Sequence, residues 1–259
     1  MVFTKRIWDI GTPIVIAHRG GGNEAPENSL QAFELMRQRG FFYLETDAQI
    51  TKDGVVVLFH DEILDRTTNG TGKVSAHTWE EVARLSDGSG VHPLKLSTVL
   101  SDYPEFVLNI DAKTDEVVVP LAQELQANQA LNRVCLASFS EKRLVRLRKL
   151  LPGVATSLGQ SSIVRLVIAS RLPKNLAEIV LRNVPRVADG VQAVQVPVSQ
   201  WGIPVVTKRF IDLAHNLGFA VHVWTVNEES QMRKLLTMGV DALITDVPSL
   251  ARKVIDTQF

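Results

Sequence analysis

The sequence has little cysteine and no net charge, and both features exclude classes of protein. Its single cysteine, Cys135, rules out an intrachain disulfide and gives no support to a cysteine-rich zinc site. Because Cys135 stands in an apolar run, residues 134–137, we expect a buried thiol without a chemical role. Lys+Arg and Asp+Glu number 28 each, so the formal net charge is zero. We therefore expect no broad polyanion-binding face and no nucleic-acid partner.

Long apolar segments are also missing. No stretch approaches the roughly 18 apolar residues that a membrane-spanning helix needs. Residues 1–9 lack the apolar stretch of about 7–15 residues that belongs to a secretion signal. A cytoplasmic protein without a transmembrane segment is the default expectation. Nothing in the composition indicates an oligomeric state.

Short β-rich runs alternate with helical patterns over the whole chain of 259 residues. The candidate strands cover residues 14–17, 43–47, 106–111, 134–138, 155–158, 191–196, 220–225 and 241–245. The candidate helices cover residues 29–39, 115–127, 141–151, 161–170, 176–181, 208–217, 228–238 and 249–255. Several strands are continuous apolar runs, as expected of parallel strands covered on both faces. Eight such units predict an α/β fold, a (β/α)8 TIM barrel, with an open doubly wound sheet as the alternative.

An insertion interrupts this alternation between the second and third strands. It covers roughly residues 48–105 and begins with an apolar run, 55–59, after a turn signal at residues 52–54. Short helical patterns follow near residues 79–85 and 97–100. We interpret the insertion as an addition to the barrel, so that residues 1–259 form a single domain.

Polar side chains collect where the predicted strands end, which is where the active site of a barrel enzyme lies. The segments that follow or end the first three strands are His18-Arg19-Gly20, Glu45-Thr46-Asp47 and Asn109-Ile110-Asp111-Ala112-Lys113. Side chains two apart on a strand point the same way, so Glu45, Asp47 and Asp111 can converge. Each acid alone could equally end a strand at the surface or cap a helix. Three together predict a site for a hard cation such as Mg²⁺ or Ca²⁺.

Groups suited to phosphate chemistry lie beside these acids. Arg19 can bind a phosphate through two hydrogen bonds, and the three glycines after it let the backbone approach a ligand. No Gly-Lys-Ser/Thr follows, so this is not a Walker loop. His60 ends the apolar run 55–58 and brings a second imidazole to the rim that carries His18. Two histidines near one phosphorus can divide proton transfer between them.

The other histidines and the late strand ends are less informative. We expect structural roles for four histidines, His77, His92, His215 and His222. Trp224, at the end of the seventh strand, could form an apolar wall of the pocket or pack in the core. Asp246 follows the eighth strand and precedes Val-Pro, so the pattern favours a helix cap over a ligand.

Together these residues resemble the glycerophosphodiester phosphodiesterase family over almost the whole chain. The most specific matches are His18-Arg19-Gly20, Pro26-Glu27-Asn28-Ser29, Glu45-Thr46-Asp47, Thr51-Lys52-Asp53-Gly54, His60-Asp61 and Arg66-Thr67-Thr68. The supporting matches are Asn109-Ile110-Asp111-Ala112-Lys113, Ser138-Phe139-Ser140, Trp224-Thr225-Val226-Asn227, Gly239-Val240-Asp241 and Thr245-Asp246. The family more often has Glu at the position of Asp111, which leaves the metal preference open.

The resemblance implies a role for each site residue. His18 and His60 would be the acid/base pair, and Glu45, Asp47 and Asp111 would hold a divalent metal, Mg or Ca. Substrate contacts are expected from Arg19, Lys113, Asn28 and Trp224. The substrate would be a small glycerophosphodiester, hydrolysed to sn-glycerol 3-phosphate and an alcohol.

Three alternatives remain open at this point. A lysophospholipase D-like enzyme would use similar parts on a lipid and would need an apolar groove, for which residues 163–172 are candidates. A phosphoinositide-type phospholipase C fits the acidic set and the later motifs less well. A non-catalytic phosphate-binding barrel is the third alternative, but a binder has no need of two proton carriers.

Overall fold

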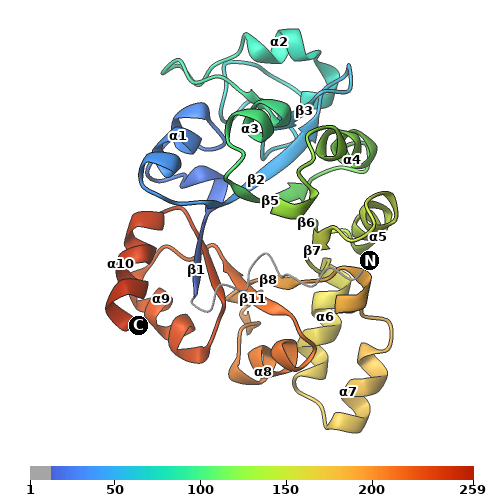
Figure 1. The fold of residues 1–259 in the computed structure, drawn as a ribbon. Coiled ribbons are helices and arrows are strands. Elements are labelled where there is room, and N and C mark those ends of the chain that lie inside the picture. The colour runs from blue at the N-terminus through green and yellow to red at the C-terminus, as the bar shows by residue number, and fades with distance from the viewer. Residues whose placement is uncertain (1–12) are drawn as a thin grey trace.

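The computed structural model describes residues 13–259, and the segment 1–9 that lacks a secretion-signal pattern lies outside the described residues. Parallel strands form the centre of the molecule, with helices around them (Figure 1). The barrel strands are β1 (Ile14–Ala17), β2 (Tyr43–Ile50), β5 (Val107–Ala112), β6 (Val134–Ala137), β7 (Ala155–Thr156), β8 (Ala193–Pro197), β11 (Ala220–Trp224) and β12 (Ala242–Thr245). Each overlaps one of the eight predicted strands.

The sheet closes on itself. Its strands are paired in the order β7-β6-β5-β2-β1-β12-β11-β8, and all of these pairs are parallel. The two ends of this path meet at a parallel bridge between Thr156 and Val191, where the backbone N–H of Gln192 donates to the Thr156 carbonyl at 2.9 Å. The predicted (β/α)8 barrel is confirmed, and the open doubly wound sheet is wrong because its edge strands would not meet.

The helices lie outside the barrel and begin close to where the sequence predicts them. They are α1 (Leu30–Gln38), α4 (Val118–Ala127), α5 (Glu141–Leu150), α6 (Gln160–Ala169), α7 (Lys174–Leu181), α8 (Lys208–Asn216), α9 (Glu229–Met238) and α10 (Pro248–Gln258). Four short 3-10 turns are η1 (His18–Gly20), η2 (Val74–Ala76), η3 (Leu131–Arg133) and η4 (Val187–Asp189). The start of α1 shows the local cause: the Ser29 hydroxyl accepts from the Ala32 N–H at 3.0 Å and caps the helix.

The insertion is joined to the barrel through hydrogen bonds to β2. Strand β3 (Val56–Leu58) pairs antiparallel with the last residues of β2, and β4 (Leu94–Lys95) pairs with β3. This pairing explains why β2 continues to Ile50, three residues beyond its predicted end. Helices α2 (Trp79–Ala83) and α3 (Leu96–Asp102) complete the insertion, and α2 lies at the edge of the molecule in Figure 1.

A short hairpin after β8 has no counterpart in the sequence prediction. Strands β9 (Ser199–Gln200) and β10 (Ile203–Pro204) pair antiparallel across a two-residue turn, Trp201-Gly202. Both turn residues have positive φ, 50° and 76°. Two-residue hairpins favour such turns, but a bulky side chain at positive φ is uncommon and costs about 1–2 kcal/mol. The turn holds the Trp201 ring in an exposed position.

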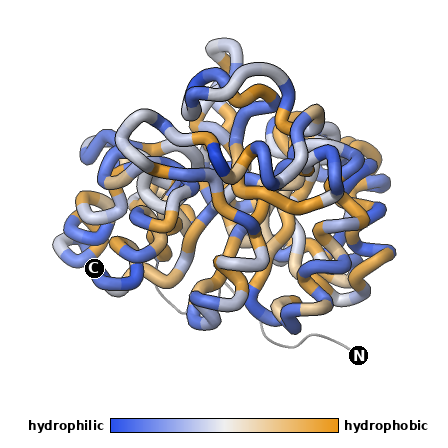
Figure 2. The backbone as a smooth tube through the Cα atoms, turned by 90° about the horizontal axis from the view of Figure 1, so that it is seen from above, coloured by the Kyte–Doolittle hydropathy of each residue, from blue (hydrophilic) through white to orange (hydrophobic). Residues whose placement is uncertain are grey.

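The apolar core follows the alternation of the strands. The inner faces of the barrel strands contribute small and branched side chains, including Ile14, Ile16, Ala193 and Ala242. Cys135 is part of the same cluster and is fully buried, as predicted. Figure 2 shows hydrophobic stretches through the middle of the molecule and many of the hydrophilic ones toward its periphery. Of the helices in residues 13–259, none combines the length and the apolar character needed to cross a bilayer.

Candidate active site

Two adjacent strands carry acidic side chains on their inner faces. In the parallel register, Glu45 and Asp47 of β2 stand beside Asn109 and Asp111 of β5. All four residues are less than a tenth exposed, and all four line one cavity. Alternate side chains on a strand share a face. The register therefore directs both side-by-side pairs, Glu45 with Asn109 and Asp47 with Asp111, toward the barrel axis. The structure therefore brings together the three acids that the strand ends single out.

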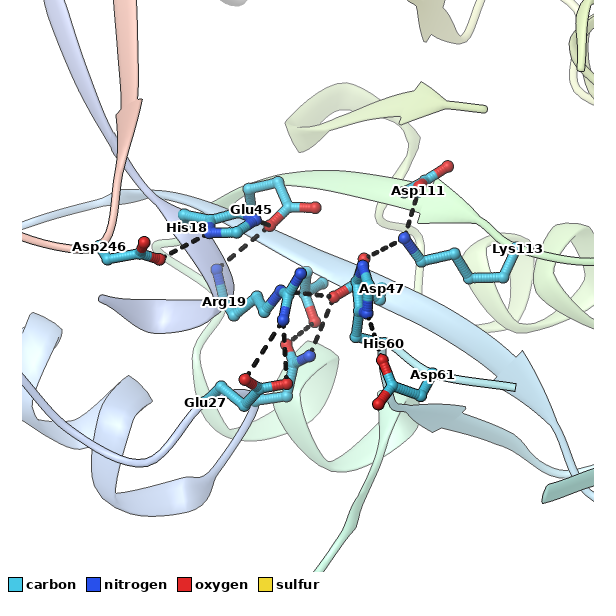
Figure 3. A network of polar contacts seen from close by, with 12 residues as sticks. His18, Arg19, Glu27, Glu45, Asp47, His60, Asp61, Asp111, Lys113 and Asp246 are labelled. Atoms are coloured by element: carbon cyan, nitrogen blue, oxygen red, sulfur yellow. Dashed lines mark hydrogen bonds and ion pairs between the residues drawn. The ribbon is translucent and has the colours of Figure 1, made fainter. Parts of the chain in front are cut away.

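His18 directly follows β1 and is held in a fixed orientation. Its Nδ1–H donates to Oδ1 of Asp246 at 2.6 Å, and its Nε2 lies 3.8 Å from Oε2 of Glu45 (Figure 3). Burial lowers the pKa of His18, but the Glu45 charge and the Asp246 hydrogen bond raise it more, so the net shift is upward. The Asp246 contact leaves Nε2 as the nitrogen available for proton transfer.

Asp246 has a different role from the one predicted. The residue that caps α10 is Val247, which makes no side-chain capping bond. Asp246 instead accepts from His18 through Oδ1 and from the Asn227 amide through Oδ2 at 2.8 Å. Since β12 pairs with β1 as the barrel closes, the end of the last strand lies beside the end of the first. The helix-cap prediction is wrong because pairing between distant strands, not the local sequence, decides which partner this carboxylate meets.

His60 reaches the same cavity from the insertion. Its Nδ1–H donates to Oδ1 of Asp61 at 2.6 Å, and Oδ2 of Asp61 accepts from Nε of Arg66 at 2.6 Å. Arg66 also donates two hydrogen bonds to Glu27, at 2.9 and 2.7 Å, and Glu27 accepts from Arg19 at 3.1 Å. The Arg66 hydrogen bond lowers the pKa of Asp61 to about 2, so this carboxylate is charged. A chain of ion pairs thus connects the histidine of the insertion to the loop after β1.

Lys113 lies between two of the acids. Its Nζ is 2.6 Å from Oδ1 of Asp47 and 2.8 Å from Oδ2 of Asp111 (Figure 3). Burial raises the pKa of Asp47, but the Lys113 charge and hydrogen bond lower it more. Burial and the Asp47 charge raise the pKa of Glu45 to about 7. Glu45 is therefore the carboxyl whose charged form is least stabilised by the surrounding protein.

Arg19 lines the cavity, whereas Asn28 lies behind the acids. The Arg19 backbone N–H donates to Glu45 at 3.1 Å, and its buried side-chain Nε makes no hydrogen bond but lies 3.5 Å from Oδ2 of Asp47. The Asn28 amide donates to Asp47 at 3.1 Å and accepts from the Thr46 hydroxyl at 2.7 Å. Asn28 is buried and does not line the cavity. The geometry thus gives Asn28 a position that supports Asp47, and the substrate contact expected from the sequence stays a prediction.

One cavity, with a volume of about 480 Å³, opens at the carboxyl ends of the strands. Its charged floor is formed by the two histidines, Arg19, Lys113 and the three acids. Trp224 lines it as well and meets Phe139 edge to face, with ring centroids 6.0 Å apart. The volume lies within the range of about 300–1,000 Å³ that is usual for small-molecule sites.

Glu45, Asp47 and Asp111 are the candidate ligands for a divalent cation. In the described part of the chain, no three His, Cys, Asp or Glu side chains are arranged as a ready metal site. The Lys113 ammonium accounts for this, because it lies between Asp47 and Asp111 and forms an ion pair with each. The chemistry of the donors still suits a hard cation: all three are carboxylates, and the buried Oδ1 of Asp111 has no hydrogen-bond partner. The residues therefore fit such an ion in kind.

Several residues of the site were not singled out by the sequence. Glu27 and Arg66 stand inside matched motifs, but only the fold shows that they pair with one another. Phe139 lines the cavity and stands inside the matched segment Ser138-Phe139-Ser140, whereas the Trp201 hairpin lines it without any sequence signal for a binding role. Asp246 had a usable signal, since a residue after the last strand of a closed barrel lies beside the first strand.

Fold and site together define a (β/α)8-barrel protein with acids, histidines and an arginine at the carboxyl ends of its strands, the position of barrel active sites. Residues 18–250 match the model of the glycerophosphoryl diester phosphodiesterase family. This match spans most of the chain, and the protein belongs to that family.

Individual relatives agree with this assignment. The chain is 35% identical over 248 residues to a Mycobacterium tuberculosis protein named "Probable glycerophosphodiester phosphodiesterase 2", covering 95% of this chain and 91% of that one. It is 30% identical over 252 residues to a glycerophosphodiester phosphodiesterase of Caldanaerobacter subterraneus, covering 91% and 94%. Among solved structures, an Oleispira antarctica phosphodiesterase in complex with the product sn-glycerol-3-phosphate matches with a TM-score of 0.78 and 25% identity, covering 95% of this chain and 97% of that one.

Proposed function

We propose that the protein hydrolyses glycerophosphodiesters to sn-glycerol 3-phosphate and an alcohol. The observation that carries this proposal is the pairing of two histidines with two aspartates around one cavity. His18 and His60 each donate a hydrogen bond from Nδ1 to an aspartate oxygen, at 2.6 Å in both cases. Both imidazoles therefore keep Nε2 for the reaction, and two proton carriers at one site are what ester exchange at phosphorus requires. Family membership and the activity for which the relatives are named support the same reaction.

The phosphodiester would lie between the cationic side chains and the acids. Arg19 and Lys113, the two cationic side chains that line the cavity beside the acids, would bind the nonbridging phosphate oxygens. Glu45, Asp47 and Asp111 would hold a divalent cation, Mg or Ca. When bound, such a cation supplies positive charge that stabilises a phosphoryl transition state. It would also replace the Lys113 ammonium as counter-charge for the two aspartates.

The two histidines would divide the proton transfers. One Nε2 takes the proton of the glycerol hydroxyl next to the ester as the hydroxyl oxygen bonds to phosphorus. The other Nε2 gives a proton to the oxygen of the departing alcohol as its bond to phosphorus breaks. Water then opens the cyclic phosphate with the two roles exchanged. Trp224 would bound the site on its apolar side.

Removal of either imidazole tests the proposal. With glycerophosphocholine as substrate, His18→Ala and His60→Ala should each lower kcat by about 10²–10⁴ while the circular dichroism spectrum is kept. His92→Ala is the matched control, because His92 is an exposed histidine of the insertion that does not line the cavity. A purified His18→Ala or His60→Ala enzyme with near-normal turnover would refute the assignment.

A further inference from the structure

The wall of the cavity changes character away from the acids. Among residues 13–259, Arg171 is the only charged side chain that lines it apart from the floor residues. Arg171 is already engaged, since its Nη2 donates to the Pro204 carbonyl at 2.6 Å and ties the end of α6 to the hairpin. The remaining wall is mostly aliphatic and aromatic. A phosphodiester with two small polar alcohols has no apolar part to place there.

Helix α6 supplies one side of this wall. A surface helix normally buries one apolar stripe against the core. In α6 that stripe includes Leu166 and Ala169, which are buried. The helix has a second apolar face, formed by Ile163, Val164, Val167 and Ile168, and this face lines the cavity. Val164 and Ile168 are one turn apart and are about half exposed, 50% and 45%. Ile163 and Val167 also pack partly against the core, so the half of this stripe that the described residues leave open is formed by Val164 and Ile168.

A further part of the wall comes from Phe139 and the β9–β10 hairpin. Phe139, Trp201 and Ile203 are 59%, 85% and 54% exposed, and all three line the cavity. Isolated exposed apolar side chains are ordinary, but contiguous ones around a cavity mark a binding surface. The Trp201 ring is held at the hairpin tip by a backbone conformation that is unfavourable for its side chain.

We infer that this wall binds the acyl chain of a single-chain glycerophospholipid, so that the substrates include lysophospholipids. The inference rests on the proposed function and names a substrate class for the same site. The apolar wall and the acid–histidine floor belong to one cavity, so the ligand that uses both must join a phosphodiester to a hydrocarbon chain. A 1-acyl lysophospholipid does so and keeps the free glycerol C2 hydroxyl that the proposed route needs.

The acyl chain does not change the proposed reaction at phosphorus. The C2 hydroxyl oxygen bonds to phosphorus, its proton goes to one histidine, and the bond from phosphorus to the head-group oxygen breaks as the other histidine protonates it. Water then opens the cyclic phosphate. The products are an acyl-glycerol phosphate and the free head-group alcohol, with the carboxylic ester intact.

A chain-length series tests the inference on the whole protein. The substrates are glycerophosphocholine and its 1-acyl derivatives of 6, 8, 10 and 12 carbons, each below its micelle-forming concentration. We expect kcat/KM to rise about twofold per methylene, since full burial of a methylene gives about fourfold and the wall is open on one side. The double variant Val164→Ser, Ile168→Ser should lower the ratio of kcat/KM for the 10-carbon lipid to that for glycerophosphocholine at least tenfold.

Ile179→Ser is the matched control, because Ile179 is an equally exposed apolar residue of the neighbouring helix α7 outside the cavity. It should leave the ratio unchanged. Turnover of glycerophosphocholine without any dependence on chain length overturns this inference but keeps the proposed function. A double variant that retains the wild-type ratio overturns the inference as well. Failure of the wild-type enzyme on every member of the series overturns the proposed function itself.

Discussion

His18 and Asp246 are 228 positions apart in the chain, yet the imidazole Nδ1 and the carboxylate Oδ1 lie 2.6 Å from one another. The first and last strands of the barrel deliver them to the same point, because β1 pairs with β12 from Ile14–Ala242 to Ala17–Thr245. The contact fixes the ring of a proposed acid/base residue. Closure of the barrel and assembly of the site are therefore one event.

Replacing Asp246 by Asn should weaken catalysis without unfolding the protein. An amide can still pair with Asn227 but no longer offers His18 a charged acceptor, so the orientation of the ring is lost and the pKa of His18 falls. We expect kcat to drop about 10–100-fold with little change in KM, and the midpoint of thermal unfolding to stay within a few degrees. An unchanged kcat would show that the Asp246 contact is not needed to position His18.

Arg66 should act on His60 through Asp61. The Arg66 side chain is about half exposed, so its ion pairs contribute little to stability, but they fix the direction of the Asp61 carboxylate. Arg66→Ala should lower kcat about threefold to tenfold, and Arg66→Lys should restore only part of it because an ammonium cannot make the paired contacts of a guanidinium. Lys73→Ala is the control, since Lys73 forms an exposed ion pair with Glu62 in the same insertion. Equal effects of Arg66→Ala and Lys73→Ala would contradict a specific role for Arg66.

Metal binding should be visible both in activity and in stability. Treatment with a chelator should abolish turnover, and Mg²⁺ or Ca²⁺ should restore it. Because a ligand that binds only the folded state adds about 2.7 kcal/mol at a hundredfold excess over Kd, the cation should raise the unfolding temperature by several degrees. Asp47→Asn should remove that shift, whereas Glu62→Gln, at an exposed acid of the insertion, should not. If neither the rate nor the melting temperature changed on adding chelator or metal, the cation would have no part in the mechanism.

His222 should make the protein sensitive to acid. It is fully buried on β11, and burial lowers its pKa to about 4 from an ordinary value near 6.5. Between these two values the unfolded chain binds a proton that the folded protein does not, so the free energy of unfolding falls as pH drops, by roughly 2–3 kcal/mol in total. Urea unfolding from pH 7 to 4.5 should show a shallower slope for His222→Gln than for wild type. His92→Gln is the exposed-histidine control, and parallel curves for wild type and His222→Gln would contradict the prediction.

Much of the architecture was predictable because it depends on local pattern. Apolar runs of strand length alternate with helical periodicity eight times, and that alternation predicts a parallel α/β fold, whereas the bridge between Thr156 and Val191 shows that the sheet closes. The inward direction of Glu45 and Asp47 follows from a spacing of two residues on one strand. The carboxyl end of β2 was harder to place, since its last three residues pair with β3 of the insertion and only the first of them, Ala48, also pairs with a barrel strand, β5.

One assignment failed because a tertiary contact decided it. Asp246 looked like a helix cap, but the strand that carries it pairs with β1 and brings its carboxylate to His18. The partners of Asn28, Asp47 and Thr46, were likewise not indicated by the sequence. The sequence gives the type of each residue, but a side chain's partner depends on which strands are neighbours.

The sequence by itself determined the barrel, the family, and the acids and histidines at the strand ends, since these follow from periodicity and from short motifs. Only the tertiary structure decided how those groups are held and what surrounds them. Asp246 accepts a hydrogen bond from His18, and Arg66 donates to both Asp61 and Glu27. Half-exposed apolar residues of α6 and the Trp201 hairpin line the same cavity. The physical reason is that each of these arrangements joins segments that become neighbours only when the barrel closes, and no local pattern in the chain encodes that proximity.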